Sequence, residues 1–311
     1  MTHAVTLPPG GAAAFGRAPV VGRHALADHA LFTDAALIEL LDRMPRERLF
    51  ALSMGTDPLR SEENRLALHD GVSGAELLRA VRKGRLWLNV TRVDRVDARY
   101  RRLFEGLYAE LAALVPGFAP DACQGTVLIS SPHALVYYHA DGPASALWHI
   151  RGRKRVWVYP PLDPRYMARE QLEDIIAGVR HEYLPYEAAY DAGASVHDLA
   201  PGDWIHWPQN APHRVTNLDS LNVSLSTEHF TRASRRRARV YVANRFFRTR
   251  LGWSGLSARE DGALALAKVL AQRVARRLGL DPVTTKSHVA ALRVAPDAPG
   301  GVVALDGGSA A

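Results

Sequence analysis

Residues 137–154, YYHADGPASALWHIRGRK, bring two histidines, an aspartate and several cations into one short stretch. In an extended strand, residues i and i+2 point to the same side, so His139 and Asp141 can present an imidazole nitrogen and a carboxylate side by side. The triplet alone is weak, because 13 His and 32 Asp and Glu in 311 residues give about one chance match to His-x-(Asp/Glu). Its meaning therefore depends on the residues that follow.

A third metal ligand can come from a separate strand far downstream. Gly202-Asp203 predicts a turn, residues 204–207 predict a strand, and the prolines at 208 and 212 predict a rigid turn that leads to His213. Together with His139 and Asp141, this histidine would complete a set of two histidines and one carboxylate. Such a set leaves three positions of an octahedral metal open and is diagnostic of non-haem Fe(II) oxygenases. The alternative is that the protein has the same fold but binds no metal at these three residues.

From Thr126 onward the sequence consists of short β-rich runs separated by Gly, Pro and Asp turns. Strands at this spacing predict a sandwich or a barrel. A helix at 168–180 interrupts them and is predicted to be an insertion. The predicted strands lie within residues 126–131, 134–140, 145–150, 154–161, 195–199, 203–208, 213–218 and 221–230.

Helices are predicted before the β-rich region. Thr33 can cap a helix over 34–44, a capping box of Ser73 and Glu76 begins a second helix that ends at Gly84, and an apolar face marks a third over 98–114. Residues 85–90 read as a strand between the second and third helices. Residues 1–18 are rich in Gly, Ala and Pro, and are predicted to be loose.

The chain after residue 230 is predicted to be helical and basic. Residues 231–250 hold eight arginines and no acid, which could attract nucleic acid, an acidic protein or a phosphorylated ligand, or could form a solvated helix face. Ser257 and Glu260 suggest another capping box. The helix that follows carries a stripe that could pack on its own domain or on a second subunit: Leu266, Leu270, Val274 and Leu278. Residues 285–311 are predicted to be a weakly ordered tail.

Composition limits the class of protein. The chain is 47% hydrophobic, enough for a substantial core, and carries a net charge of +7. Its single cysteine, Cys123, excludes an intramolecular disulfide and a multi-cysteine zinc site, and suits a cytoplasmic location. No run of 18 apolar residues and no signal peptide is present, so no membrane association is expected.

The order of these motifs resembles that of the JmjC/cupin-type oxygenases that depend on Fe(II) and 2-oxoglutarate. The shared pattern is His139-Ala-Asp141, an apolar strand that runs into Gly-Arg-Lys-Arg at 152–155, Gly202-Asp203, and Pro212-His213. Residues 23–32 also resemble the lead-in of bacterial cupin-like JmjC proteins. The resemblance implies a mainly β fold with helical additions: a catalytic domain over 19–230 whose core, 126–230, is a double-stranded β-helix (jelly roll), N-terminal helices, and a C-terminal helical segment over 231–284.

The resemblance also implies roles for individual residues. His139, Asp141 and His213 would bind Fe(II), and Lys154, fifteen residues after His139 as in asparaginyl-hydroxylase-like members, would bind the far carboxylate of the co-substrate 2-oxoglutarate. Tyr138 and Ser224 are further candidate contacts for the co-substrate.

Four other positions qualify this assignment. Several family members carry a threonine where this chain has Val136, which cannot donate a hydrogen bond to 2-oxoglutarate. His149 and His206 are expected to be core residues or neighbours of the site rather than ligands. Ser145 could line the pocket.

By this resemblance, the protein would use O2 and 2-oxoglutarate to hydroxylate an unactivated C–H bond, releasing succinate and CO2. A protein or peptide side chain is the favoured substrate. The alternatives are a small metabolite, or a non-catalytic cupin that binds a ligand or nucleic acid. A homodimer through the C-terminal helices is a further expectation from the family. A cupin enzyme that does not use 2-oxoglutarate usually carries a His-x-His arrangement, which is not found here.

Overall fold

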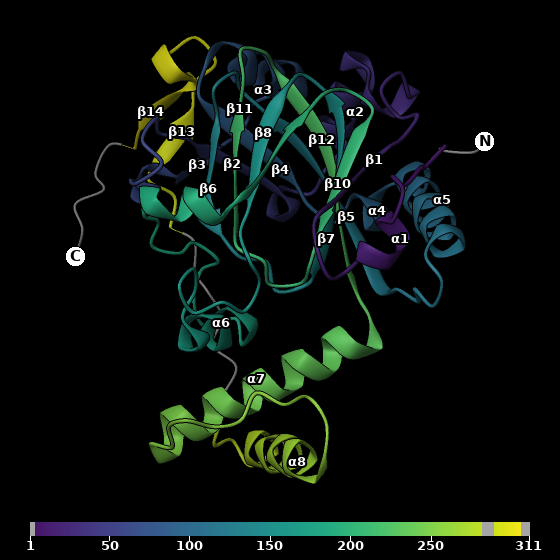
Figure 1. Ribbon diagram of the computed structural model, residues 1–311. Coiled ribbons are helices and arrows are strands. Elements are labelled where there is room, and N and C mark those ends of the chain that lie inside the picture. Colours follow the sequence, from purple (N-terminus) through teal and green to yellow (C-terminus); the bar gives the residue numbers. More distant parts are fainter. Residues whose placement is uncertain (1–3, 282–288, 306–311) are drawn as a thin grey trace.

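Two β-sheets pack face to face in the upper part of the molecule, and a pair of long helices lies below them (Figure 1). The computed structural model describes residues 4–281 and 289–305. Among these residues, no helix combines the length and the apolar character needed to cross a bilayer.

The larger sheet has ten strands in the spatial order β1-β10-β7-β12-β5-β4-β2-β3-β13-β14. Their bounds are β1 Val20–Arg23, β2 Leu49–Ser53, β3 Arg65–Leu68, β4 Leu86–Val90, β5 Asp121–Ser130, β7 Ala144–Arg151, β10 Asp203–Trp207, β12 Asn222–Phe230, β13 Leu292–Val294 and β14 Val302–Ala304. The smaller sheet has the order β6-β11-β8-β9. Its strands are β6 Leu135–His139, β8 Lys154–Val158, β9 Ser195–Leu199 and β11 His213–Asn217.

The eight strands predicted between residues 126 and 230 are all present. Along the chain the strands alternate between the two sheets, except that β8 and β9 both lie in the smaller one, and this arrangement is that of a jelly roll. The predicted mainly β fold with helical additions is therefore confirmed. The sequence analysis did not predict β1, β2, β3, β13 or β14, which are short strands at or near the ends of the larger sheet.

The helices before the β-rich region cover the outer face of the larger sheet. The predicted helices are confirmed as α2 Asp34–Arg43, α3 Gly74–Lys83 with its Ser73–Glu76 capping box, and α5 Ala98–Leu114. Two short helices accompany them, α1 Gly11–Ala14 and α4 Val93–Val96. The largest apolar core lies between these helices and the sheet, where Leu37, Leu77 and Leu107 are fully buried.

A smaller apolar cluster lies between the two sheets: Leu147, Val156, Val158, Leu199, Ile205, Trp207, Ala211 and Val215. Because side chains alternate along a strand, this cluster shows which residues face the interior of the sandwich. On β7, Ser145 and His149 lie on the same face as Leu147. On β8, Lys154 lies on the same face as Val156.

Two helices form the C-terminal segment, α7 Arg232–Leu251 and α8 Ala263–Arg277. The predicted insertion helix is α6 Arg169–Ile176, which is ion-paired to α7. The predicted capping box at Ser257 and Glu260 is wrong. The helix begins six residues after Ser257, at Ala263, and Glu260 forms an ion pair with Arg237 instead.

Both ends of the chain differ from the sequence expectation within the described residues. Val5 is buried and Thr6 pairs with Arg23 of β1, so residues 4–18 are held against the sandwich; residues 1–3 lie outside the described part. In the tail predicted to be weakly ordered, β13 pairs with β3 and buries Leu292 and Val294. Residues 285–288 and 306–311 of that tail lie outside the described part.

Candidate metal centre and co-substrate pocket

A β-bulge brings the first histidine of the motif opposite the second. His139 of β6 pairs with His213 of β11, and the next pair along is Val136 with Val215. Tyr137 and Tyr138 thus lie opposite the single residue Arg214. One extra residue in a strand reverses the facing of the side chains that follow. Both Val136 and His139 therefore face the interior, although their spacing of three would put them on opposite sides of a regular strand.

Each histidine is held by a hydrogen bond from its Nδ1 to the backbone. His139 Nδ1 donates to the carbonyl of Tyr137 at 2.8 Å, and His213 Nδ1 donates to the carbonyl of Ala211 at 3.0 Å. A carbonyl can only accept, so in the neutral tautomer Nε2 carries the free lone pair. Backbone partners of this kind orient metal-binding histidines in proteins.

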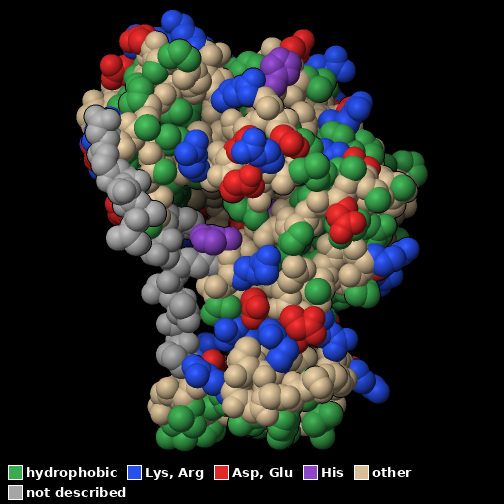
Figure 2. All heavy atoms as spheres, turned by 90° about the vertical axis from the view of Figure 1, so that its left-hand side faces the viewer, with side chains coloured by type: hydrophobic (Ala, Val, Ile, Leu, Met, Phe, Trp, Pro, Cys, Tyr) green, Lys and Arg blue, Asp and Glu red, His purple; other side chains and the backbone are tan. Residues whose placement is uncertain are grey.

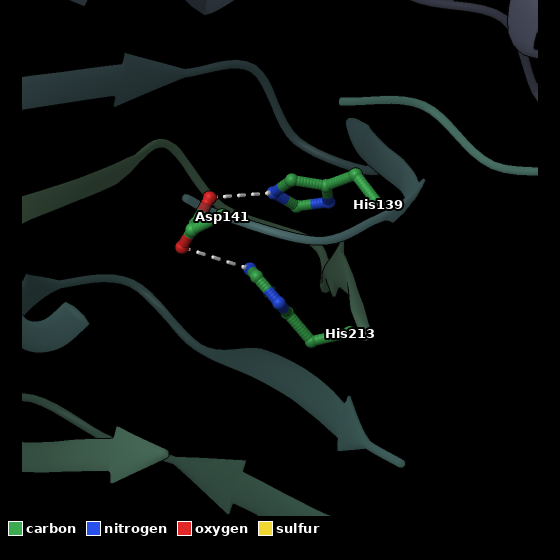
Figure 3. Close-up of side chains that lie close together, drawn as sticks. All are labelled: His139, Asp141 and His213. Atoms are coloured by element: carbon green, nitrogen blue, oxygen red, sulfur yellow. Dashed lines mark ion pairs between the residues drawn. The ribbon is translucent and has the colours of Figure 1, made fainter. Parts of the chain in front are cut away.

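Asp141 lies to one side of the two imidazoles, with one carboxylate oxygen facing each ring (Figure 3). Its Oδ1 is 3.6 Å from Nε2 of His139, and its Oδ2 is 3.6 Å from Nε2 of His213. The three donor atoms all lie within 4.8 Å of one another. Burial lowers the pKa of His213 to about 4, so this imidazole is neutral near pH 7 and able to bind a metal. The donor set fits Fe(II), for which two imidazoles and one carboxylate are typical ligands.

Lys154 is buried inside the sandwich and has no ion pair with any carboxylate of the described residues. Burial lowers its pKa from the usual 10.5 to about 7. Its neighbours Arg153 and Arg155 point to the opposite side of the strand, and Arg155 is paired with Asp198 on the surface. A buried ammonium without a counter-charge is costly, so an anion bound beside it would stabilise it.

His149 lies close enough to Lys154 to feel its charge, and Ser224 is hydrogen-bonded to His149. His149 Nε2 donates to the carbonyl of Gly152 at 2.9 Å, so its Nδ1 accepts from the Ser224 hydroxyl at 3.0 Å. Burial, and to a smaller extent the charge of Lys154, lower the pKa of His149 to about 3. His149 is therefore a neutral neighbour of Lys154 and is not in the group of candidate metal ligands, as expected.

The structure does not bring the Tyr138 side chain to Lys154 or to the candidate metal ligands. Its side chain lies on the outer side of β6, where the hydroxyl donates to the carbonyl of Tyr166 at 2.8 Å and the ring packs on Tyr159. The bulge explains the difference, because simple counting along the strand does not give the facing of residues beside an inserted position. Its predicted contact with the co-substrate does not fit this placement.

His206 lies outside the site, on the outer face of the larger sheet. It is fully buried and stacks on Phe15, with ring centroids 4.0 Å apart. This agrees with the expectation of a core residue. The ring still contacts the site indirectly, because its Nδ1 donates to the backbone carbonyl of Ser145 at 2.8 Å.

Three polar residues beside the metal ligands were not identified from the sequence. Asn210 donates to the carbonyl of Asp141 at 2.9 Å, and Gln209 donates to the carbonyl of Gly142 at 2.9 Å, so both amides hold the turn that carries the carboxylate. Glu228 faces the interior beside Ser145, and burial followed by the charge of Asp141 raises its pKa to about 7. The polar alternation Ser224, Ser226, Glu228 along β12 was the available signal for the last of these.

Comparison with known proteins identifies the fold. No protein-family model and no curated protein matches the sequence. Among solved structures, the chain is similar to the X-ray structure of ycfD from E. coli, with a TM-score of 0.50 and 16% identity over 88% of this chain and 68% of that one. The two proteins share their fold.

Two further structures of the Escherichia coli protein also match. They are the ribosomal oxygenase YcfD, with a TM-score of 0.49 and 14% identity over 95% of this chain and 76% of that one, and YcfD in complex with cobalt and 2-oxoglutarate, with a TM-score of 0.46 and 14% identity over 90% and 71%.

The metal centre can be tested without any substrate. We predict that the protein binds Co(II) and that His139→Ala weakens this binding on the order of 100-fold or more, because a ligand is lost. His197→Ala is the matched control, since this histidine of β9 is hydrogen-bonded to Ser195 and is not in the ligand group found among the described residues. Titration calorimetry measures both; equal affinities in the two variants would contradict the assignment.

Proposed function

We propose that the protein is an oxygenase that depends on Fe(II) and 2-oxoglutarate and hydroxylates an unactivated C–H bond. The observation that carries the proposal is the presence, inside one sandwich, of a ligand set of His139, Asp141 and His213 together with a buried, unpaired Lys154. The first suits a metal with open positions, and the second suits the far carboxylate of a dicarboxylic acid. Neither alone would indicate 2-oxoglutarate.

The overall reaction is balanced by the co-substrate. 2-Oxoglutarate, O2 and R–H give succinate, CO2 and R–OH, so one oxygen atom enters succinate and the other enters the product. Bound Fe(II) would supply the redox chemistry that activates O2. The protein residues present the two imidazole nitrogens and one carboxylate, pair Lys154 with the anion, and exclude water with apolar neighbours. Trp207 contributes to this exclusion, with its ring centroid 4.3 Å from that of His213.

Ser224 supports the co-substrate end of the pocket. Its hydroxyl donates a hydrogen bond to His149, but its oxygen can still accept one from Lys154 or from a bound water. Val136 faces the same interior and offers no hydrogen bond. The anion would therefore depend mainly on Lys154, which makes this lysine the residue to test.

A protein or peptide side chain is the substrate class that we favour. The E. coli protein with this fold is described as a ribosomal oxygenase, and it forms complexes with cobalt and 2-oxoglutarate. Its likeness to this chain is a likeness of fold, so the residues described above carry the proposed chemistry. A small metabolite is the alternative substrate.

The cytoplasmic location expected from the sequence stays a prediction.

Lys154→Met tests the proposal through two opposite effects. Wild-type protein with Fe(II) and O2 should convert 2-oxoglutarate to succinate, and the variant should need a much higher 2-oxoglutarate concentration, by a few kcal/mol of lost binding. The metal-free variant should be more stable than wild type, on the order of 1–4 kcal/mol near pH 7, because a buried charge is replaced by an apolar chain.

The stability of the wild-type protein should depend on pH through the titration of Lys154. The pKa of Lys154 is about 7 in the folded protein and near 10.5 when unfolded, so the unfolded chain binds more protons between these values. Wild-type stability should therefore rise from pH 7 to 10.5, and the advantage of the variant should shrink over that range. Calorimetry measures the melting temperatures and an assay measures succinate. Unchanged 2-oxoglutarate dependence would remove Lys154 from its role.

We further propose that the C-terminal helices form a homodimer. Within the described residues, the apolar stripe of α8 and its C-cap is left largely exposed: Leu266, Leu270, Val274 and Leu278 are 61%, 49%, 55% and 69% exposed. The opposite face of α8, including Lys268 and Ala275, is buried against α7 and the segment that joins the two helices. Hydrophobic side chains are visible at the lower end of the molecule, over these helices (Figure 2). An exposed stripe of this kind is typical of a subunit interface.

Leu270→Glu should convert the dimer into a monomer, because it places a charge in the centre of the stripe. Sedimentation at micromolar concentration measures the mass. Leu59→Glu is the control, since this exposed leucine lies in a loop of the sandwich. A monomeric wild type would contradict the dimer.

Binding of nucleic acid through the arginines of α7 stays a prediction. Half of the eight are used within the molecule: Arg235, Arg237, Arg245 and Arg248 are ion-paired with Asp121, Glu260, Asp174 and Glu173. Acidic and basic side chains accordingly lie together where the sandwich meets the C-terminal helices (Figure 2). These ion pairs indicate that the basic residues of α7 attach the C-terminal helices to the rest of the protein.

A further inference from the structure

Ser145 contacts the carboxylate that the proposed metal centre requires. It is the second residue of β7, is almost fully buried, and faces the interior of the sandwich. Its hydroxyl donates to Oδ2 of Asp141 at 2.8 Å. Oδ1 of Asp141 accepts no hydrogen bond from any described residue and lies beside Nε2 of His139.

The two oxygens of Asp141 would otherwise be equivalent. A carboxylate can bind a metal through one oxygen or through both, and binding through both would use one of the positions that a co-substrate or O2 needs. A hydrogen bond to Oδ2 uses one of its lone pairs and draws electron density from that oxygen, which makes it the weaker ligand. The contact therefore distinguishes Oδ1 from Oδ2.

The hydrogen bond from Ser145 sets the orientation of the Asp141 carboxylate. Asn210 and Gln209 fix the backbone of the turn at Asp141 and Gly142, but their amides bond only to carbonyl oxygens. The carboxylate itself accepts a hydrogen bond from Ser145 alone among the described side chains. The rotation of the Asp141 side chain thus depends on where Ser145 places its hydroxyl.

Ser145 is in turn held from the opposite side of the sheet. His206 donates its Nδ1 proton to the carbonyl of Ser145 at 2.8 Å, and burial lowers the pKa of His206 to about 3, so it remains a neutral donor. Phe15 stacks on this ring at an interplanar angle of 11° and covers it, and Nε2 of His206 has no partner in the described structure. The N-terminal segment is thereby connected to the metal ligand through two hydrogen bonds.

We propose that Ser145 is a positioning residue that selects Oδ1 of Asp141 as the metal ligand and keeps the carboxylate bound through one oxygen. This inference rests on the proposed metal centre. It assigns to one hydroxyl group the task of keeping a coordination position free for the co-substrate. His206 and Phe15 support it by fixing the start of β7.

Co(II) provides the test, because its visible absorption depends on the number of ligands. Wild type and Ser145→Ala are loaded with Co(II) without oxygen, and binding is measured by calorimetry and by the visible spectrum. The variant should bind Co(II) about 10–100-fold more weakly, as is typical when a partner of a metal ligand is removed. Its spectrum should also change, and at saturating Co(II) the response of that spectrum to 2-oxoglutarate should weaken.

Two further variants separate positioning from a general effect on folding. Ser145→Thr keeps the hydroxyl donor and should retain most of the wild-type Co(II) affinity and the wild-type spectrum. Ser226→Ala removes another hydroxyl of the interior of the larger sheet that does not contact Asp141, and should behave as wild type. Melting temperatures of the metal-free proteins establish that each variant is folded.

The outcomes are distinct. A folded Ser145→Ala protein with wild-type affinity and an unchanged spectrum would overturn the role of Ser145 and leave the proposed function intact. An equal loss in Ser226→Ala would also overturn it. A wild-type protein that binds no Co(II) would contradict the metal centre itself.

Discussion

The pairing of β6 with β11 is the interaction on which the rest of the site depends. It sets His139 opposite His213, two residues that are more than seventy positions apart in the chain. The bulge at Tyr137 and Tyr138 then turns His139 inward, and the turn after β6 places one carboxylate oxygen of Asp141 beside each imidazole. A slip of one residue in this register would turn one imidazole away from the other.

Two environments on opposite faces of the larger sheet affect the stability of the protein differently. The large apolar core lies between the larger sheet and helices α2, α3 and α5, outside the sandwich. The space between the sheets contains a smaller apolar cluster together with Lys154, His149 and Ser224. The outer core supplies most of the hydrophobic stabilisation, so the inner space can accommodate polar groups that cost stability and prepare a binding site.

The sequence predicted the jelly-roll strands and helices α2, α3 and α5 because each carries a complete local signal of periodicity and capping. It did not predict β2 or β13, since these short strands are stabilised by pairing with β4 and β3, which no local pattern shows. The ligands His139, Asp141 and His213 could be proposed from motif order. The roles of Ser145, Asn210 and Gln209 depend on side-chain contacts across the fold, and Tyr138 was misplaced because a bulge cannot be read from alternation.

The most direct test of the account is the visible spectrum of the Fe(II)-loaded protein, recorded without oxygen while 2-oxoglutarate is added. A metal held by only His139, Asp141 and His213 has room to be chelated by the keto and carboxylate groups of 2-oxoglutarate, which gives a weak charge-transfer band. We expect this band to appear and to saturate as 2-oxoglutarate is added. Bound Fe(II) with no band at saturating 2-oxoglutarate would contradict it.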